Sequence, residues 1–595
     1  MTNGLARPAV DVYRRPDGTI LLSSPEPLGA CDRAVGEWLE HWARAAPDRA
    51  FLQERVEGVW RGTTYAEARE RVHRLATWLL QNAAASGPVA ILSDNSVEQG
   101  LLTLAAMHVG IPVAPVSPAY STQSKDFAKL KAIISLIEPG VVYAGDATRY
   151  GPAFAAIRDL HRGIEASPAS FDSLPQADDL AVDARFRAIG PDTIAKLLFT
   201  SGSTGEPKGV INTQGMLCSN QQARLQHWPL LIHEPPIIVD WLPWSHTFGG
   251  NHNFGLVLRN GGTLYIDGGR PVQPLFAQTV ANLRDVASTI HFNVPRGVDL
   301  LVAALETDAE LKQRFFSRMS IVFCAAAALP PHLWTALRRL AKDARSEPVL
   351  ITSGWGSTET APLATDCPWQ AELPGVIGQP AAGTELKLVP NGGKLEVRVR
   401  GPNVTPGYWK RPDLTAKLWD EEGFYRIGDA VRFTDPERPE LGLLFDGRVA
   451  EDFKLDTGTW VNVGVLRVKA IAALAPVAQD IVLAGHDRSE VGFLVFPNVA
   501  ACRALVPSLN SDAPLSEVLG SGPVRARVRE GLARLRDESS GSSGHGNRAL
   551  LLVDPPSIDR GEITDKGYLN QRAVLASRED LVRELYGDSV GVIRI

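Results

Sequence analysis

The sequence predicts an α/β fold with parallel sheets, and the order of its apolar runs supports this prediction. An apolar run at 88–92 ends in polar residues, a helical stretch follows at 97–109, and a second apolar run occupies 111–116. Strand, polar turn, helix and strand in this order are typical of a βαβ unit, whose strands lie parallel. Apolar runs at 194–200, 237–243 and 349–356 also end in polar or glycine-rich residues, where parallel sheets place their binding loops. From about residue 383 the pattern changes to strands in which apolar and polar residues alternate, as at 394–400, so that one face is exposed to solvent.

Length and composition limit the possible functions. A chain of 595 residues is expected to form two or more domains. Its 44% hydrophobic and 22% charged residues are an ordinary globular balance, and the net charge of −6 argues against general nucleic-acid binding. No apolar run is long enough for a membrane span, and the N-terminal residues 1–18 lack the apolar core of a signal peptide. The five cysteines form no metal or disulfide pattern, so we expect a reducing, cytoplasmic setting.

The most informative stretch is a glycine- and hydroxyl-rich loop directly after the apolar run at 194–200. Glycines let backbone N–H groups approach phosphate oxygens, hydroxyls add donors, and a lysine supplies positive charge. It differs from the Walker A motif, because Lys208 precedes Gly209 and Val210 instead of Ser or Thr. The predicted phosphate-binding residues are Thr200, Ser201, Gly202, Ser203, Thr204, Gly205 and Lys208.

This loop resembles the phosphate-binding signature of the adenylate-forming superfamily, which comprises acyl-CoA synthetases, peptide-synthetase adenylation domains and luciferases. The resemblance covers about residues 34–575 and is strongest to feruloyl-CoA synthetases. It implies a large N-terminal domain of parallel α/β sheets plus a small β-barrel, followed by a small mobile α+β C-terminal domain. The turn signal at Asp446-Gly447 places the predicted boundary between domains 1–446 and 447–595.

The resemblance implies a reaction in two halves. A small-molecule carboxylic acid attacks the α-phosphate of ATP, giving an acyl-adenylate and pyrophosphate, and the thiol of coenzyme A then displaces AMP. Because the first half brings two anions together, it needs Mg²⁺, a cation and many donors around the phosphates. The expected partners are therefore the acid, ATP, Mg²⁺ and coenzyme A, and the sequence leaves oligomerisation open.

A second motif, at 354–360, resembles the superfamily's aromatic-Gly-x-Thr-Glu signature. Trp355 would stack on adenine beside Gly356. Thr358 would donate to the α-phosphate, and Glu359 would hold Mg²⁺, which prefers hard oxygen ligands. Gly354 is assigned to the acyl site. The alternative interpretation of this stretch is a capping box that opens a helix.

The remaining nucleotide contacts follow from a third signature. Asp429, in Tyr-Arg-Ile-Gly-Asp at 425–429, would accept hydrogen bonds from the ribose hydroxyls, and Arg448 would reach the same ribose from the domain junction. Ala326 lies in a run of small residues that resembles the strand end shaping the adenine and acyl pockets. A plain buried strand remains an alternative for this run.

The acyl site is predicted at 241–251. His246 would lie next to the acyl carboxylate, where a histidine contributes charge and a donor near neutral pH. Trp244 and Phe248 would form flat walls, and Gly249 and Gly250 would let the backbone approach the substrate ring. A structural histidine, and rings that only pack the core, remain alternatives.

The C-terminal part departs from the superfamily pattern in two places. Members carry a lysine near the C-terminus for adenylation, but strict overlay from Thr564 puts Tyr568 at that position. After Arg448 the only lysines are at 454, 469 and 566, and we assign this role to Lys566. Ala450 occupies the position of the usual hinge aspartate, which leaves the pivot open.

We therefore predict a carboxylic acid–CoA ligase that acts through an acyl-adenylate on a ferulate-like aryl or phenylpropenoid acid. The alternatives are a CoA ligase for fatty acids or other small acids, and an acyl-AMP ligase that loads a carrier protein. A nucleotide-binding homologue without catalysis is a further alternative, which Lys208, Glu359 and Asp429 disfavour.

Overall fold

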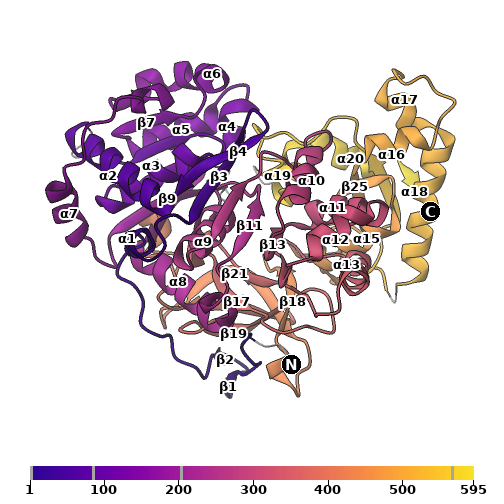
Figure 1. Ribbon diagram of the computed structural model, residues 1–595. Coiled ribbons are helices and arrows are strands. Elements are labelled where there is room, and N and C mark those ends of the chain that lie inside the picture. Colours follow the sequence, from indigo (N-terminus) through magenta and orange to yellow (C-terminus); the bar gives the residue numbers. More distant parts are fainter. Residues whose placement is uncertain (1–3, 83–86, 202–205, 540, 565–568) are drawn as a thin grey trace.

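The computed structural model describes residues 4–82, 87–201, 206–539, 541–564 and 569–595 (Figure 1). In Figure 1 the first parallel sheet and its helices lie at the upper left, an antiparallel sheet lies at the bottom, and most of the chain after residue 453 lies at the right. The α/β prediction is confirmed, with a large N-terminal part and a smaller C-terminal one.

A six-stranded sheet carries the predicted phosphate loop. Its strands β5 (Val89–Leu92) and β6 (Val113–Val116) are parallel and joined by α3 (Val97–His108), as the βαβ pattern predicted. Ser96 caps α3, since its hydroxyl accepts the backbone N–H of Gln99. Only the edge strand β10 runs antiparallel, in a hairpin with β9. In spatial order the strands are β10 (Pro207–Thr213), β9 (Ile194–Ser201), β6 (Val113–Val116), β5 (Val89–Leu92), β7 (Val141–Ala144) and β8 (Ile164–Ala166).

Two smaller sheets complete the parallel part. The four-stranded sheet is parallel except for the hairpin of β3 and β4, and the three-stranded sheet is fully parallel. The first contains β11 (Ile237–Asp240), β12 (Thr263–Ile266), β3 (Ala50–Val56) and β4 (Val59–Thr64); the second contains β13 (Ile290–Asn293), β14 (Ile321–Cys324) and β15 (Leu350–Thr352).

The region predicted as a small β-barrel forms most of a nine-stranded antiparallel sheet. The sheet curls around one core, because β18 lies beside β2 and buried apolar side chains from seven of its strands form a single cluster. The N-terminal strands β1 and β2, which the sequence analysis did not predict, pair with it. The strands are β1 (Asp11–Arg14), β2 (Ile20–Ser23), β19 (Glu385–Asn391), β20 (Lys394–Arg400), β21 (Tyr425–Phe433), β22 (Leu443–Arg448), β18 (Val376–Pro380), β17 (Leu363–Asp366) and β16 (Gly354–Gly356).

The C-terminal part is α+β and has core clusters of its own, formed by residues between 453 and 593. The predicted boundary between 446 and 447 falls inside β22. The division into domains 1–446 and 447–595 stays a prediction. Its strands are β23 (Phe453–Lys454), β24 (Trp460–Val461), β25 (Ala478–Ala484), β26 (Gly492–Pro497), β27 (Arg548–Leu551) and β28 (Ile593–Arg594).

Helices pack against the parallel sheets of the N-terminal part and against the sheet of the C-terminal part (Figure 1). Among the described residues, every helix is too short or too polar to cross a lipid bilayer. The α-helices are α1 (Gly36–Ala45), α2 (Tyr65–Asn82), α3 (Val97–His108), α4 (Pro118–Thr122), α5 (Ala128–Ile137), α6 (Ala147–Ile157), α7 (Asp179–Arg187), α8 (Gln214–His227), α9 (Phe254–Arg259), α10 (Phe276–Asp285), α11 (Pro295–Thr307), α12 (Ala309–Phe316), α13 (Pro331–Ala344), α14 (Pro412–Thr415), α15 (Val463–Ala473), α16 (Val499–Ala504), α17 (Leu515–Gly520), α18 (Gly522–Asp537), α19 (Gln571–Ser577) and α20 (Glu579–Tyr586).

Candidate nucleotide and acid site

The predicted phosphate loop connects the two strands of the β9–β10 hairpin. Thr200 and Lys208 are paired across this hairpin, so the loop leaves and re-enters the sheet at one edge. Gly202, Ser203, Thr204 and Gly205 lie outside the described residues, and Ser201 is described only as the last residue of β9. The Nζ atom of Lys208 lies 5.1 Å from the centre of the Tyr408 ring.

Tyr408 connects Lys208 to Glu359. Its hydroxyl donates a hydrogen bond to Glu359 Oε1 at 3.0 Å, and Glu359 is only 8% exposed. Burial, together with the Glu359 carboxylate, raises the pKa of Tyr408 above its ordinary value, so the phenol stays a donor at neutral pH. The two predicted phosphate and metal residues therefore lie on either side of one buried ring. No sequence motif pointed to Tyr408, because it is two hundred positions along the chain from Lys208.

The capping box that was the alternative interpretation of residues 354–360 opens only a single turn. Thr358, Glu359 and Thr360 form one 3₁₀ turn, η5 (Thr358–Thr360), in which Thr360 Oγ1 accepts the backbone N–H of Ser357. The turn ends at once, and no α-helix follows. Thr358 and Glu359 are both largely buried within it.

The glycines around Trp355 are required by close backbone contacts. A Cβ atom at Gly356 would lie 1.6 Å from the carbonyl oxygen of Pro362, and one at Gly354 would lie 2.7 Å from that of Thr365. Any larger residue would force β16 away from its neighbours. The backbone of the second signature is therefore fixed by its packing.

Trp355, Asp429 and Arg448 are brought together. The indole Nε1–H of Trp355 donates to Asp429 Oδ2 at 2.9 Å, and Arg448 Nε lies 3.5 Å from Asp429 Oδ1. Burial raises the pKa of Asp429, while Arg448 and the Trp355 hydrogen bond act in the opposite direction. Asp429 Oδ1 is buried and accepts no hydrogen bond among the described residues, which leaves an acceptor open beside the indole ring.

Ala326 has an unusual backbone. It follows β14, is exposed, and has a φ of +74°, in the left-handed region that costs a residue with a side chain about 1–2 kcal/mol. Such strain is frequent at binding sites. β14 ends at Cys324, and residues 326–328 are exposed, so the alternative of a plain buried strand is wrong for them.

At the predicted acyl site, the rings pack into the core. Trp244 and Phe248 are each 5% exposed; Trp244 meets Phe254 edge-on at 5.0 Å, and Phe248 meets Phe323 at 5.9 Å. His246 is half-buried, and its Nδ1 accepts the backbone N–H of Phe248 at 3.2 Å. The acyl-wall role of these side chains stays a prediction.

Gly249 and Gly250 are the second and third residues of a π-helical segment, η4 (Phe248–Asn253), that packs against the preceding loop. Cβ atoms at these positions would lie 2.4 Å from Leu242 O and 2.2 Å from Trp244 O. In this structure the two glycines thus allow the chain's own backbone to come close. Their predicted contact with the substrate ring stays a prediction.

A buried lysine that sequence reasoning missed also holds η4. Lys196 in β9 is 4% exposed, and its Nζ donates to Gly250 O at 2.7 Å. Burial lowers the pKa of Lys196 from 10.5 to about 7. A charged residue inside the apolar run at 194–200 was the available signal, since a lysine is rarely buried without a functional or structural partner.

Lys566 lies outside the described residues. The chain on its N-terminal side reaches the first parallel sheet, because Lys129 Nζ in α5 donates to Ile558 O at 2.6 Å and the Lys125 N–H donates to Asp559. Ile563 and Leu569 form a β-bridge. The role of Lys566 stays a prediction.

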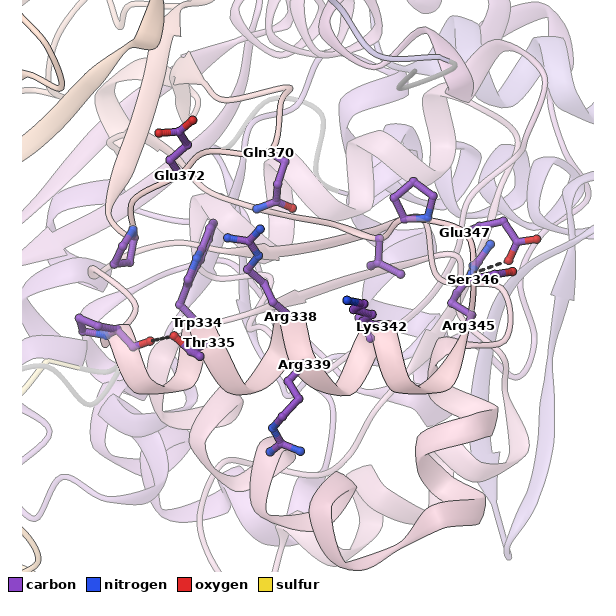
Figure 2. A pocket seen from close by; sticks show the side chains of 15 residues that line it. Trp334, Thr335, Arg338, Arg339, Lys342, Arg345, Ser346, Glu347, Gln370 and Glu372 are labelled. Atoms are coloured by element: carbon purple, nitrogen blue, oxygen red, sulfur yellow. Dashed lines mark hydrogen bonds and ion pairs between the residues drawn. The ribbon is translucent and has the colours of Figure 1, made fainter.

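Two other features lie away from these residues. A surface groove of about 650 Å³ runs along α13, where Figure 2 shows Arg338 pointing toward Gln370 and Arg339 pointing away. Among the described residues, none of those predicted for the site lines this groove. Glu40, His73 and His108, on α1, α2 and α3, form a cluster that could hold a metal ion, and none of them was predicted for the site.

Comparison with known proteins decides the family, because a family model for AMP-binding enzymes matches residues 39–409. The chain belongs to the AMP-binding enzyme family. The predicted superfamily is thereby confirmed, whereas the finer resemblance to feruloyl-CoA synthetases is not shown by the matches.

The relatives of this AMP-binding enzyme differ in what their names describe. It is 26% identical to the carboxylic acid reductase of Mycobacterium tuberculosis, over 71% of this chain and 39% of that protein. It is 25% identical to the long-chain-fatty-acid–CoA ligase FadD15 of Mycobacterium bovis, over 69% of this chain and 74% of the ligase. The chain spans less than half of the carboxylic acid reductases that it matches.

Solved structures confirm the fold. The A domain of the carboxylic acid reductase of Segniliparus rugosus, solved with AMP and a carboxylic acid, has a TM-score of 0.68 at 20% identity, over 93% of this chain and 94% of that one. The anthranilate CoA ligase AuaEII, in complex with anthranoyl-AMP, has a TM-score of 0.70 at 18% identity, over 94% and 99%. At these identities the likeness establishes the architecture alone.

Proposed function

We propose that this protein activates a carboxylic acid with ATP and transfers the acyl group to the thiol of coenzyme A. A carboxylate oxygen forms a bond to the α-phosphorus of ATP, and the bond to pyrophosphate breaks. The thiolate then forms a bond to the acyl carbon, and AMP leaves with the electron pair of its bond to that carbon. The preferred acid is a ferulate-like aryl or phenylpropenoid acid.

The observation that carries this proposal is the open acceptor on Asp429. Asp429 Oδ1 is buried and accepts no hydrogen bond from the described residues, although Arg448 Nε lies 3.5 Å away. Such an oxygen is costly, and it is explained if a ribose hydroxyl donates to Asp429 Oδ1 when nucleotide binds. Trp355 Nε1 holds the other oxygen, which fixes the carboxylate beside a flat ring suited to adenine. Arg448 adds a positive charge on the same side.

The phosphates of ATP would lie between the β9–β10 loop and η5. Lys208 would neutralise the pyrophosphate, with Thr200, Ser201 and the loop glycines as donors, and Thr358 would donate to the α-phosphate. The carboxylate of Glu359, held by the Tyr408 hydroxyl, suits Mg²⁺, which would neutralise phosphate charge when bound. His246 and Lys566 would contact the acid, and Ala326 would border the adenine.

The aryl preference rests on the resemblance and on the rings near His246. Phe248, Phe292 and Phe323 pack together, with ring centres about 6 Å apart. Planar acids favour aromatic walls. The rival within the same chemistry is a fatty acid or another small acid.

We also propose that residues 447–595 form a mobile lid on a body of residues 1–446. The same site has to serve two reactions in turn, which is the physical reason for a moving domain. In support of this proposal, Ile558 O in the C-terminal part accepts a hydrogen bond from Lys129 Nζ in the N-terminal part.

A second candidate is an acyl-AMP ligase that loads a carrier protein. One relative, from Arabidopsis thaliana, is named a long-chain-fatty-acid–[acyl-carrier-protein] ligase, and is 27% identical over 40% of this chain. Purified protein with ATP, Mg²⁺, coenzyme A and a panel of ferulate, 4-coumarate, benzoate and medium-chain acids decides between the candidates. Acyl-CoA formation, fastest with aryl acids, supports the proposal. AMP formation without acyl-CoA, or a preference for saturated aliphatic acids, contradicts it.

A further inference from the structure

A buried polar cluster lies in the aromatic core behind the predicted acyl site. It consists of Arg224 in α8, His252 in η4 and Asp366 in β17, all at most 2% exposed. Arg224 Nη1 lies 2.6 Å from Asp366 Oδ1, and Arg224 Nε donates to His252 Nε2 at 3.1 Å. The guanidinium lies over the Trp228 ring at 4.0 Å. We call these three residues the inner polar cluster.

The fold itself gives no reason for charges at this place. Burying an ion pair in an apolar core seldom stabilises a protein more than apolar packing would. The cluster also leaves atoms unsatisfied: among the described residues, Arg224 Nη2 has no acceptor, and Asp366 Oδ1 accepts no well-aligned hydrogen bond. Buried groups without partners require an explanation, and a ligand that supplies the missing bonds is one.

The inner polar cluster is one side chain away from the acyl site. The Phe323 ring lies 5.2 Å from the Arg224 guanidinium and 5.9 Å from the ring of Phe248. A Cβ atom at Gly354 would lie 3.1 Å from Phe323 and 3.5 Å from Asp366 Oδ1. Phe248 and Gly354, both predicted for the acyl site, therefore have the cluster directly behind them.

The charges of the cluster balance. Burial and the nearby Arg224 lower the pKa of His252 to about 3, so the imidazole is neutral at physiological pH. Burial alone would raise the pKa of Asp366, but Arg224 and His227 outweigh it and hold it at about 2. Within the inner polar cluster, one positive guanidinium thus faces one negative carboxylate, whose other oxygen lies 3.2 Å from His227 Nδ1. Such a pair suits a neutral group that both donates and accepts, and does not suit a second carboxylate.

We propose that the inner polar cluster binds a hydroxyl group on the ring of an aryl acid, at the end away from the carboxylate that reacts. Arg224 Nη2 donates to the hydroxyl oxygen, and the hydroxyl donates to Asp366 Oδ1. This inference rests on the proposed function and names its substrate class: hydroxylated aryl acids. Sites that hydrogen-bond a substrate hydroxyl reject the analogue lacking it far more strongly than apolar pockets discriminate by size.

The first test uses the unmodified protein. We expect kcat/KM for 4-hydroxycinnamate to exceed that for cinnamate by about a hundredfold or more, measured as coenzyme A-dependent AMP formation. A dicarboxylate, 4-carboxycinnamate, is expected to be as poor as cinnamate. Equal turnover of 4-hydroxycinnamate and cinnamate overturns the inference.

The second test removes the pair together, because removing one partner would leave a buried charge and could unfold the protein. In the double variant Arg224→Met, Asp366→Leu we expect the preference for the hydroxyl to fall by about tenfold or more, with cinnamate turnover retained. The matched control is the double variant Lys387→Met, Asp420→Leu, which removes both partners of another buried ion pair, 3.0 Å apart beside the antiparallel sheet. A preference unchanged in a folded double variant, or lost equally in the control, overturns the inference.

The outcomes separate this inference from the proposed function. Turnover of aryl acids regardless of their hydroxyl groups contradicts the role of the cluster and leaves acid activation intact. Absence of turnover with every acid contradicts the proposed function, and the inference falls with it. If the double variant does not fold, the comparison of 4-hydroxycinnamate with cinnamate in the unmodified protein still decides.

Discussion

Asp429 and Arg448 face each other across neighbouring strands. Their Cα positions are paired between β21 and β22, and Arg448 Nε lies 3.5 Å from Asp429 Oδ1. The residue at the predicted domain junction is thus in contact with the carboxylate proposed to hold the ribose. A movement of the chain after β22 would change this contact, which couples the proposed lid to nucleotide binding.

Replacement of Asp429 by Asn tests the ribose site. The variant keeps the shape of the side chain but loses the charge, and we expect KM for ATP to rise about tenfold or more, since hydrogen bonds to charged groups contribute about 1.5–3 kcal/mol. Steady-state kinetics with varied ATP measure this. Asp435→Asn, on a surface turn beyond β21, is the control. An unchanged KM for ATP in the Asp429 variant contradicts the assignment.

Tyr408→Phe tests the contact with Glu359. The change removes the 3.0 Å hydrogen bond and leaves the ring beside Lys208 in place. Because partners that orient a metal ligand typically affect metal affinity by 10–100-fold, we expect half-saturation by Mg²⁺ to need about tenfold more metal. Titrating Mg²⁺ at fixed ATP measures the shift. An identical Mg²⁺ dependence would mean that Glu359 is not the metal residue or that Tyr408 does not orient it.

Lys196 predicts a pH-dependent stability. Burial lowers the pKa of Lys196 from 10.5 to about 7, so between these pH values only the unfolded chain carries the proton. The contribution of Lys196 to the free energy of unfolding therefore increases as pH rises through that window, by up to about 1.4 kcal/mol per pH unit. Below about pH 7 this contribution does not change with pH.

Urea denaturation at pH 7, 8 and 9 measures this effect. The stability of the unmodified protein relative to Lys196→Met is expected to rise across the series, whereas the exposed Lys417→Met shows no such trend. A difference between the unmodified protein and Lys196→Met that stays constant from pH 7 to 9 contradicts the prediction.

Gly250→Ala tests the packing of η4. The new Cβ atom would lie 2.2 Å from the Trp244 carbonyl oxygen, and such overpacking costs about 1–3 kcal/mol, so we expect a lower Tm. Gly520→Ala is the matched control, since nothing lies within 4 Å of its Cβ position. Equal Tm values for the two variants, measured by calorimetry, would show that η4 adapts without cost.

Lys566→Ala tests the C-terminal lysine. If Lys566 contacts the acid and ribose during adenylation, the variant loses acid-dependent exchange of pyrophosphate into ATP. It should still convert a synthetic acyl-adenylate to acyl-CoA. Near-normal exchange in the variant rules the assignment out.

How far the sequence predicted the structure depended on how local each signal was. The βαβ unit around α3 is a continuous stretch, and its pattern was sufficient to predict it. Tyr408 and the pairing of β1 with the antiparallel sheet depend on contacts between distant residues, which periodicity does not reveal.

The acyl region shows the same limit in another form. The motif around His246 was visible, but the packing of Trp244 and Phe248 into the core was only one of two interpretations. Arg224 and Asp366 are separated by more than a hundred residues, so a single sequence shows two ordinary charged residues where the structure has a buried pair.

The most direct test of the central claim is acid-dependent exchange of labelled pyrophosphate into ATP by the purified protein. With ferulate and Mg²⁺ we expect exchange that stops when the acid is omitted and is strongly reduced in Asp429→Asn. No exchange with any acid of the panel, or exchange that ignores the acid, would contradict the claim that this site activates carboxylic acids.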